Sequence, residues 1–417
     1  MIAVLVFLIF LASGGVAVAL GLGWLLHLIV VVWILSISTI SRKLTFPVRY
    51  LINAAALIIL LIVTSLGRDE FGLDSNALVI IAKIMICVLL AAYFGSYSTY
   101  FIVVQMVKVF EAVMILSLFM FFVMNLIPSM AFTVGKTSIN EPINTIFWLG
   151  YFKQYDYLKY NLIRNQGVFW EPGVMGFFVV FFLILKIYIV KCRNRMYLYA
   201  ITVCSTLSAG AIPLLFLVLG NFYYMEVFRD RLISRSRVAV DAILLLLSVL
   251  LGLLVMLGAS NPDILLSILG AIFKRDFSTD SSTSVRAMDL VYGFRAALIS
   301  PVFGHGNDYT DYYALTSSEL NVSKDAYDGG ITNSIIQLFY KYGALFAIYY
   351  ICLLYRFVRK LSKKSCVFLT IIFTLMLMHE PLHFSLIVLY FLLLPNGMVN
   401  INPTNKYIAH FPARGHY

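Results

Sequence analysis

The stretch Arg164-Asn-Gln-Gly-Val-Phe-Trp-Glu-Pro-Gly-Val-Met-Gly176 stands directly before an apolar run that extends to Val190. Proline is tolerated in the first turn of a helix, because the N–H group that it lacks would be unpaired there. We therefore predict that Pro172 opens a membrane helix and that Glu171 lies close to its N-cap. A helix start also favours anions, and Arg164 adds a full positive charge nearby. The same pattern is also typical of an ordinary helix start that Glu171 caps with its own side chain.

The composition of the whole chain indicates the environment of this helix. Of the 417 residues, 61% are hydrophobic and 12% are charged, and the mean hydropathy is +0.92. A soluble domain carries roughly 25% charged residues, so the composition excludes a soluble globular protein. We expect an all-α polytopic membrane protein, with a bundle of about twelve transmembrane helices and a large outer-loop subdomain.

The cysteines give no sign of a disulfide framework or of a metal site. The five cysteines are odd in number and lie in or beside apolar runs. The sequence contains no Cys-x-x-Cys pair and no Cys/His cluster with zinc-ligand spacing. We therefore predict no metal and no cofactor.

The net charge of +11 indicates membrane orientation and does not require a nucleic-acid partner. Basic clusters with few acids recur at intervals, as in the cytoplasmic loops of membrane proteins. The acidic residues concentrate in the segments between these clusters. We therefore expect both termini in the cytoplasm and the acidic loops outside. The basic clusters are Arg42-Lys43, Lys191 to Arg195, Arg229 to Arg237 and Arg356 to Lys364.

The apolar runs divide the chain into six segments. In the central one, the run from Met196 to Glu226 is interrupted by Ser205-Thr-Leu-Ser-Ala-Gly210 and Pro213, which favours two short helices with a polar joint. Irregular backbone inside a membrane needs cover from protein or a wet cavity, so this joint is a candidate wall of an internal site. The six segments are N-terminal transmembrane helices (1–128), a first outer loop (129–165), central transmembrane helices (166–259), a large outer-loop subdomain (260–330), C-terminal transmembrane helices (331–397) and a cytoplasmic tail (398–417).

Two further expectations follow from these segments. A span from about Lys108 to Ile127 places Glu111 in its first turn, near the interface, where a carboxylate costs far less than at mid-membrane. The first outer loop is rich in aromatic residues such as Trp148 and Tyr151. They are typical of an interfacial belt, and a sugar-stacking surface is the other interpretation.

Three pieces of the sequence between residues 160 and 345 together resemble a known family. They are Arg164…Gly-Val-Phe-Trp-Glu-Pro-Gly173, Ser284-Val-Arg286…Pro301-Val-Phe-Gly-His-Gly306 and Asp328-Gly-Gly-Ile-Thr-Asn333…Tyr342-Gly343. The first is similar to an Arg…Gly-x-x-x-Glu-Pro element, the second to an outer-loop arginine followed by Pro-x-x-Gly-x-Gly, and the third to a segment that often carries His-Asn before a helix. The family is the bacterial O-antigen and capsule repeat-unit polymerases (Wzy type), within the O-antigen ligase superfamily.

The resemblance implies inverting glycosyl transfer at the outer face of the bacterial inner (plasma) membrane. A growing glycan on undecaprenyl pyrophosphate would move onto a new lipid-linked repeat unit, to build O-antigen, capsule or exopolysaccharide. The implied fold resembles lipid-dependent (GT-C-like) glycosyltransferases, and a chain-length regulator and a flippase are candidate partners besides membrane lipid. An O-antigen ligase is the near alternative. A lipid flippase is the distant one, because transporters usually show internal repeats and this sequence shows none.

This chemistry needs cations for the pyrophosphate and a base for the acceptor hydroxyl. Arginine presents a planar, permanently charged fork that matches phosphate oxygens. We therefore expect Arg164 and Arg286 at the phosphate, with Glu171 as the third catalytic residue. Arg295 is a weaker candidate, because on a straight helix it lies about 180° from Arg286, and Arg286 can also pair with Asp289. The expected substrate-binding residues are Trp170, Arg295, His305, Asp328 and Asn333.

The identity of the base stays open at this stage. Thr332 stands where ligases have histidine, so that role cannot be carried over. The candidates are Glu171, Asp328, His305 and the His379-Glu380 pair. Simpler structural roles compete with the first three: Glu171 would cap a helix, Asp328 would shape a turn, and His305 would fill a glycine-rich bend.

Overall fold

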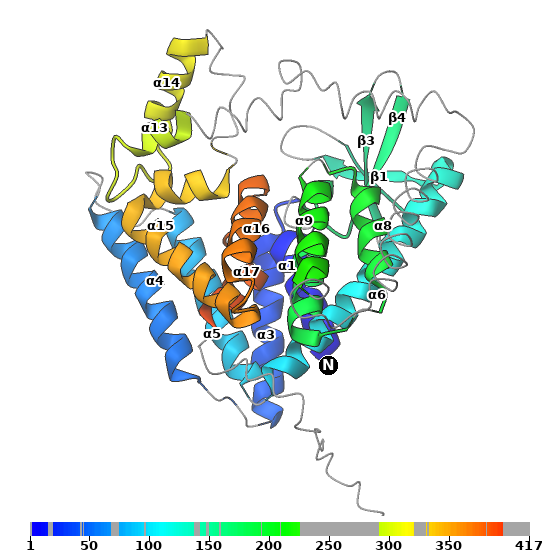
Figure 1. Cartoon of the computed structure of the whole chain (residues 1–417), viewed down its shortest axis with the longest axis horizontal. Helices are drawn as coiled ribbons and strands as arrows, with labels where there is room; N and C mark the ends of the chain where they lie inside the picture. Colours follow the sequence, from blue (N-terminus) through cyan, green and yellow to red (C-terminus); the bar gives the residue numbers. More distant parts are fainter. Residues whose placement is uncertain are drawn as a thin grey trace, which may run out of the picture.

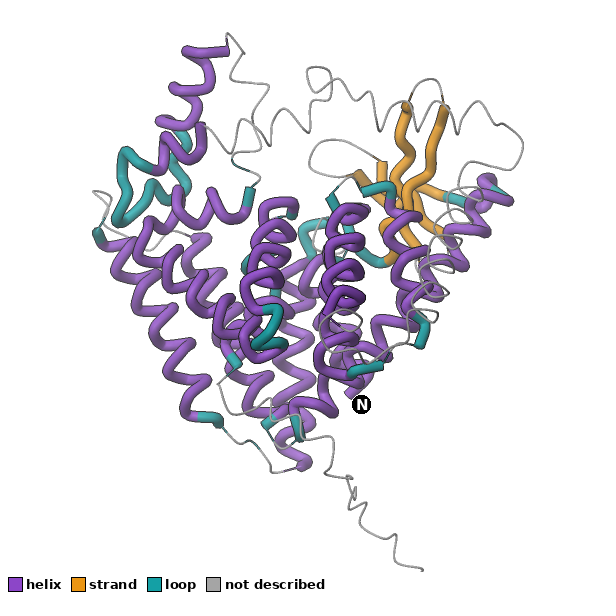
Figure 2. The backbone as a smooth tube through the Cα atoms, viewed as in Figure 1, coloured by secondary structure: helices purple, strands orange, loops and turns teal. Residues whose placement is uncertain are grey.

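Most described residues belong to helices that lie side by side in one bundle (Figure 1). A small antiparallel sheet and a helical lobe occupy the same end of this bundle (Figure 2), and the chain begins at the other end. The computed structural model describes residues 2–15, 20–41, 44, 46–67, 75–95, 97–136, 142–146, 150–157, 160–192, 194–208, 210–225, 292–320, 331, 333–380 and 382–394.

The helices follow the chain in three groups. The first group is α1 (Ile2–Gly14), α3 (Gly23–Ser41), α4 (Val48–Leu66), α5 (Ser75–Phe94) and α6 (Thr99–Leu126). The second is α7 (Pro172–Leu185), which continues into the π-helical turn η2 (Lys186–Val190), then α8 (Met196–Thr206) and α9 (Ala211–Tyr223). The third is α13 (Phe294–Ala297), α14 (Thr310–Leu320), α15 (Ser334–Leu361), α16 (Cys366–His379) and α17 (Leu386–Leu393).

Among the described residues, five helices are long and apolar enough to cross a membrane. Shorter apolar helices of 10–17 residues accompany them. This agrees with the expected polytopic membrane protein. The span expected near residues 238–259 lies outside the described residues, so the expected total of about twelve spans stays a prediction. The five long stretches are Val48–Leu66, Asn76–Phe94, Thr99–Leu126, Pro172–Val190 and Ser334–Leu361.

Helix α7 forms the centre of the bundle. All 14 of its residues are buried, as expected for a helix that is apolar on every side. Its aromatic side chains contact three other helices: Phe182 stacks on Phe110 of α6 at 4.5 Å and meets Phe10 of α1 at 5.2 Å, and Phe181 meets Phe373 of α16 at 5.8 Å. The apolar run after Pro172 is therefore the core around which the other helices pack.

The segment that was expected to form a first outer loop contains a four-stranded antiparallel sheet in the order β1-β2-β3-β4, which the sequence did not predict. The strands are β1 (Phe132–Lys136), β2 (Pro142–Ile146), β3 (Gly150–Tyr157) and β4 (Tyr160–Gly167). Strands β3 and β4 form a hairpin that pairs Tyr157 with Tyr160. Aromatic residues, which are frequent in β3, favour strands. The sheet carries Arg164 on its last strand, immediately before α7.

Candidate functional site

Arg164, in the middle of β4, binds the C-terminal end of α8. Its Nε atom donates to the carbonyl oxygen of Thr206 (3.0 Å) and its Nη2 atom to that of Leu207 (3.4 Å). The last carbonyls of a helix lack partners within the helix and carry partial negative charge. Helix α8 ends here because Leu207 adopts a left-handed conformation (φ 49°). The Arg164 cation thus stabilises the C-terminus of α8.

Asn165, next to Arg164 in β4, is fully buried. The sequence gives no local signal for its role, which is to link three elements through hydrogen bonds. Its Oδ1 atom accepts from Ser117 Oγ of α6 (2.7 Å) and from the backbone N–H of Gly167 (2.9 Å). Its Nδ2 atom donates to Ser205 Oγ of α8 (2.9 Å). These bonds join β4, α6 and α8, and they fix the backbone on which Arg164 lies.

The start of α7 confirms the predicted role of Pro172, which is the first helical residue. Glu171 occupies the N-cap position, but its exposed side chain makes no capping hydrogen bond. The simpler interpretation, in which Glu171 caps its own helix, is therefore not what the structure shows. Trp170 bonds through its backbone N–H to the carbonyl of Gly14 (3.1 Å). Its buried Nε1 atom has no hydrogen-bond partner within the described part of the chain.

The carboxylate of Glu380 lies against the first turn of α7. A Cβ atom added to Gly173 would overlap Glu380 Oε1, so glycine is the residue that leaves room for this side chain. Only 3% of the Glu380 side chain is exposed. The N-terminus of a helix favours an anion, and here the chain supplies one of its own.

His379 connects Glu380 to the joint between α8 and α9. Its Nε2 atom lies 3.0 Å from Ser208 Oγ and 3.6 Å from Glu380 Oε1. Three atoms of its ring crowd the place where Gly210 would carry a side chain, so the ring packs directly on this glycine. The predicted break is confirmed, since α8 ends at Thr206 and α9 begins at Ala211.

These contacts bring distant parts of the chain to one place. The joint between α8 and α9 binds Arg164 from the sheet at Thr206 and Leu207, and it binds His379 from α16 at Ser208. A guanidinium, an imidazole and a carboxylate thus lie around one short segment of irregular backbone. The imidazole and the carboxylate can accept protons, and the guanidinium can stabilise negative charge. We call Arg164, Ser208, His379 and Glu380 the joint cluster.

His305 lies apart from the joint cluster, in the lobe formed by residues 292–320. Its Nε2 atom lies 2.9 Å from the carbonyl of Ala296, its Nδ1 atom lies 3.3 Å from Asp311 Oδ2, and its ring stacks on Tyr340 at 4.5 Å. Both ring nitrogens therefore have partners inside the lobe. Nearby, hydrogen bonds from Thr310 hold the pKa of the Asp308 carboxyl below its ordinary value.

The glycine-rich turn that precedes His305 packs backbone to backbone on a kink in α15. The kink lies at Gly343, whose φ of 74° favours glycine. The N–H of His305 donates to the carbonyl of Tyr340 (2.6 Å), and the N–H of Ala344 donates to that of Pro301 (2.7 Å). The second and third pieces of the family resemblance therefore meet at this contact, where their glycines permit a close approach.

The other candidate substrate-binding residues have local roles or fall outside the description. Asn333 caps α15, with its Oδ1 atom accepting from the backbone N–H groups of Ile335 (3.1 Å) and Ile336 (3.2 Å). Arg295 is exposed on α13, with its guanidinium 5.9 Å from the centre of the Tyr292 ring. Arg286 and Asp328 lie outside the described residues.

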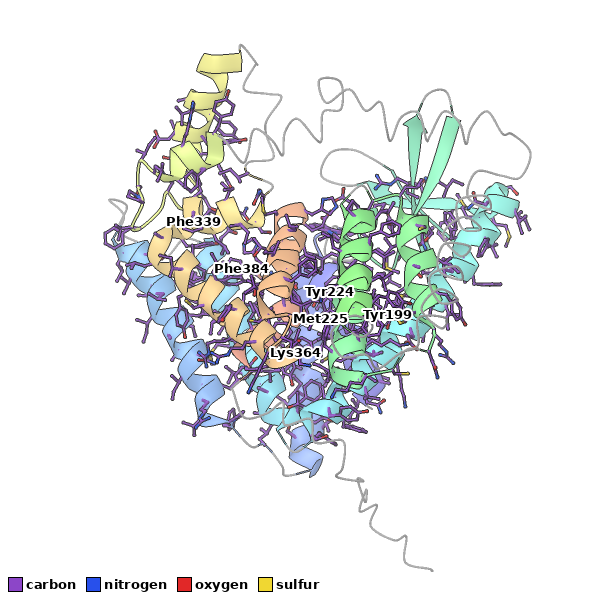
Figure 3. The ribbon with its side chains drawn as sticks, in the orientation of Figure 1. Tyr199, Tyr224, Met225, Phe339, Lys364 and Phe384 are labelled. Carbon is purple, nitrogen blue, oxygen red and sulfur yellow. The ribbon has the colours of Figure 1, made fainter. Side chains whose placement is uncertain are left out.

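Glu111 is buried in the middle of α6, so the expectation that it lies in the first turn of its helix is wrong. Helix α6 begins at Thr99 because Ser98 caps it, with its Oγ atom accepting from Phe101 N (3.1 Å). The Glu111 carboxylate pairs with Lys186 and with Arg195 (3.4 Å), and it accepts from Tyr199 Oη (3.3 Å). Tyr199 is labelled in Figure 3. A buried carboxylate is tolerated when it is paired in this way.

The remaining observations concern ligands and relatives. Among the residues that the structure describes, no group of three or more His, Cys, Asp or Glu side chains is arranged to hold a metal ion. The chain matches no protein-family model, no curated protein and no solved structure.

Proposed function

We propose that this chain is a glycosyltransferase that polymerises oligosaccharide repeat units carried on undecaprenyl pyrophosphate. The supporting observation is the joint cluster, in which Arg164, the break between α8 and α9, and the His379–Glu380 pair meet within a bundle of membrane helices. Glu171 adds an exposed carboxylate beside α7, whose first turn contacts Glu380. The cluster thus combines a cation for the leaving group with proton acceptors for the acceptor hydroxyl.

The reaction needs little acid catalysis, because pyrophosphate is already a good leaving group. The acceptor oxygen attacks the anomeric carbon while the bond to the phosphate oxygen breaks, and the electron pair leaves with the phosphate. A guanidinium stabilises the charge that develops on the leaving oxygen. Arg164 brings its permanent charge to the joint, where it also binds the carbonyls of Thr206 and Leu207.

The acceptor's proton must pass to a base as the new bond forms. His305 is a poor candidate, because both its nitrogens have partners in the lobe. Glu171 is exposed, and 13% of the His379 side chain is exposed. Glu380 is too enclosed to meet a sugar directly, and it serves instead to orient His379. The base in this proposal is Glu171 or His379.

The proposed compartment is the outer face of the bacterial plasma membrane. The described basic residues of the loops, among them Arg195 and Lys364, follow the ends of helices that point away from the sheet and the lobe. Figure 3 shows Lys364 farther from the lobe than Phe339, which lies beside it. Basic loops remain in the cytoplasm, which supports an outer location for the lobe and the sheet. A chain-length regulator and a flippase are the partners that such an enzyme would need.

Deletion of the gene, followed by electrophoresis of the surface polysaccharide, tests the proposed function. We expect a single repeat unit without a ladder, and re-expression of the wild-type chain should restore the ladder. Polymer that stays on its lipid carrier would identify a ligase instead. Loss of all surface product would favour a flippase, and an unchanged ladder would exclude all three activities.

A further inference from the structure

The lobe carries an edge of large apolar side chains that remain exposed. Phe294 is 45% exposed, Leu298 58%, Ile299 57% and Val302 45%. Single exposed apolar residues are common on proteins, but a contiguous group marks an interaction surface. We call these four residues the apolar edge.

Three residues of the apolar edge, Phe294, Leu298 and Ile299, lie on one face of the turn that α13 forms, and Val302 follows in the next turn of the chain. Residues four apart lie on the same side of a helix, and successive residues are about 100° apart. Phe294 and Leu298 therefore lie together, as do Arg295 and Ile299, so that Phe294, Leu298, Arg295 and Ile299 cover one continuous arc. The opposite arc carries Ala296 and Ala297, which are buried in the aromatic cluster of the lobe. The orientation of the edge is thus fixed by packing.

The apolar edge adjoins two candidate membrane spans, at the C-terminal end of α4 and at the kink in α15. The ring of Phe303, next to Val302, packs on Gly67 at the end of α4, where a Cβ atom would lie 2.5 Å from it. Ala344 of α15 donates to the carbonyl of Pro301. In Figure 1, α13 lies directly above the N-terminal part of α15. Leu66 at the end of α4 and Leu345 of α15 are also exposed, so the apolar surface of the spans continues into the edge.

Arg295 provides the polar part of this surface. It is exposed within the same arc as Leu298 and Ile299, and its guanidinium lies over the ring of Tyr292. Arginine extends its charged group toward lipid phosphates while its stem contacts apolar surface. Tyrosine is enriched at the same level of a bilayer. Apolar side chains beside an arginine and a tyrosine are the composition of a helix that lies in the membrane interface.

We propose that the apolar edge of the lobe inserts into the membrane interface, with Arg295 at the lipid phosphates. The occupant of this surface is the lipid bilayer, because the edge continues the apolar surface of the two spans at the end of α4 and at the kink of α15. The lobe then lies on the bilayer surface beside α4. This inference is independent of the proposed glycosyl transfer and holds for any activity of the chain.

Photo-crosslinking to lipid tests the proposal. A benzophenone amino acid is placed at Leu298 in the full chain, which is purified in nanodiscs of phosphatidylcholine with phosphatidylglycerol. The matched control carries the same group at Ala314, which is exposed on α14, away from the spans. Intact-mass spectrometry then counts lipid adducts. We expect at least fivefold more lipid adduct at position 298 than at position 314.

Two results would overturn the proposal. Equal lipid adducts at the two positions would show that the edge does not enter the bilayer, and adducts to a second copy of the chain would assign the edge to a protein interface. The role of Arg295 has its own readout, since Arg295→Glu should lower the ratio of phosphatidylglycerol to phosphatidylcholine adducts at position 298. An unchanged ratio would remove Arg295 from the lipid phosphates.

Discussion

Substitutions of Glu171 can distinguish a catalytic role from a structural one, because its exposed side chain makes no capping hydrogen bond. We expect Glu171→Asn and Glu171→Asp to change the free energy of unfolding by no more than about 0.5 kcal/mol, as for most surface substitutions. Asparagine cannot accept the acceptor's proton at neutral pH, so the polysaccharide ladder should collapse in that variant. Aspartate is shorter by one methylene and should give an intermediate ladder. Immunoblots of the membrane fraction control for protein level.

A wild-type ladder from Glu171→Asn would contradict this role for Glu171. The base would then be sought at His379, whose Nε2 atom already lies near a hydroxyl and a carboxylate. His379→Gln provides the corresponding test with the same two measurements.

Arg164 should be sensitive to a substitution that keeps its charge. Lysine presents its donors at one point, so it cannot span the carbonyls of Thr206 and Leu207 as the guanidinium does. Loss of one charge-assisted hydrogen bond costs about 1.5–3 kcal/mol. We expect Arg164→Lys to lower the melting temperature and to slow polymerisation about ten- to a hundredfold. Arg359→Lys, at an exposed position of α15, is the matched control. Equal melting temperatures and equal polymerisation rates in the two variants would contradict the expectation.

Single residues of the site could be predicted only in part. The sequence offers His379 and Glu380 as candidate bases, because a titratable pair is visible in the short segment between two apolar runs. Their neighbours lie elsewhere in the chain, Ser208 in the joint between α8 and α9 and Gly173 in α7, so no local pattern connects them to the pair. Asn165 was missed for the same reason, since its partners lie on α6 and α8.

Among the elements, the contact between α16 and α7 can be tested by a double-mutant cycle. Gly173→Ala puts a methyl group where the Glu380 carboxylate lies, and overpacking of this kind costs about 1–3 kcal/mol. The shorter side chain of Glu380→Ala removes the collision. We therefore expect the double variant to lose less in melting temperature than the sum of the losses in the two single variants. Strict additivity of the melting temperatures would show that the two residues do not touch.

The buried ion pair between α6 and η2 should be the most sensitive element contact on the basic side of the bundle. Glu111→Gln leaves the ammonium of Lys186, which is 3% exposed, without a counter-charge. Breaking a buried pair in this way costs about 3–5 kcal/mol. Replacing both partners, as in Glu111→Leu with Lys186→Met, should cost less than the single change. Thermal unfolding in detergent measures the stability of both variants. A smaller loss of stability in Glu111→Gln than in the double variant would refute the pairing.

Helix boundaries were predictable where a local signal exists, and strands were not. Pro172 and the small polar residues between α8 and α9 determine helix ends that lie within one helical turn of their own positions. The sheet depends on pairing between strands, and cross-strand contacts leave only a weak pattern in each strand. The sequence predicts the start of α6 too late, because Lys108 suggests a membrane boundary whereas Ser98 caps the helix.

The whole molecule combines a rigid centre with irregular backbone at one end. Helix α7 is buried on every side, whereas α17 has 8 residues and spans only about 12 Å at 1.5 Å per residue. Residues 382–385, directly before α17, are non-helical, and Tyr350 donates to the carbonyl of His383 in this segment (2.7 Å). Phe384, labelled in Figure 3, packs edge-on against Tyr342. Backbone of this kind needs cover within a membrane, and the same end of the bundle carries the joint cluster.

The orientation of the molecule decides whether the joint cluster can meet lipid-linked sugars outside the cell. We expect Ala314→Cys, on the lobe, to react with an impermeant maleimide in whole cells. Lys363→Cys, in the basic segment between α15 and α16, should react only after permeabilisation, because basic loops stay in the cytoplasm. Both variants are made after the five native cysteines are replaced by alanine. The reverse labelling pattern would place the lobe and the joint cluster on the cytoplasmic side, and glycosyl transfer at the outer face would then be impossible.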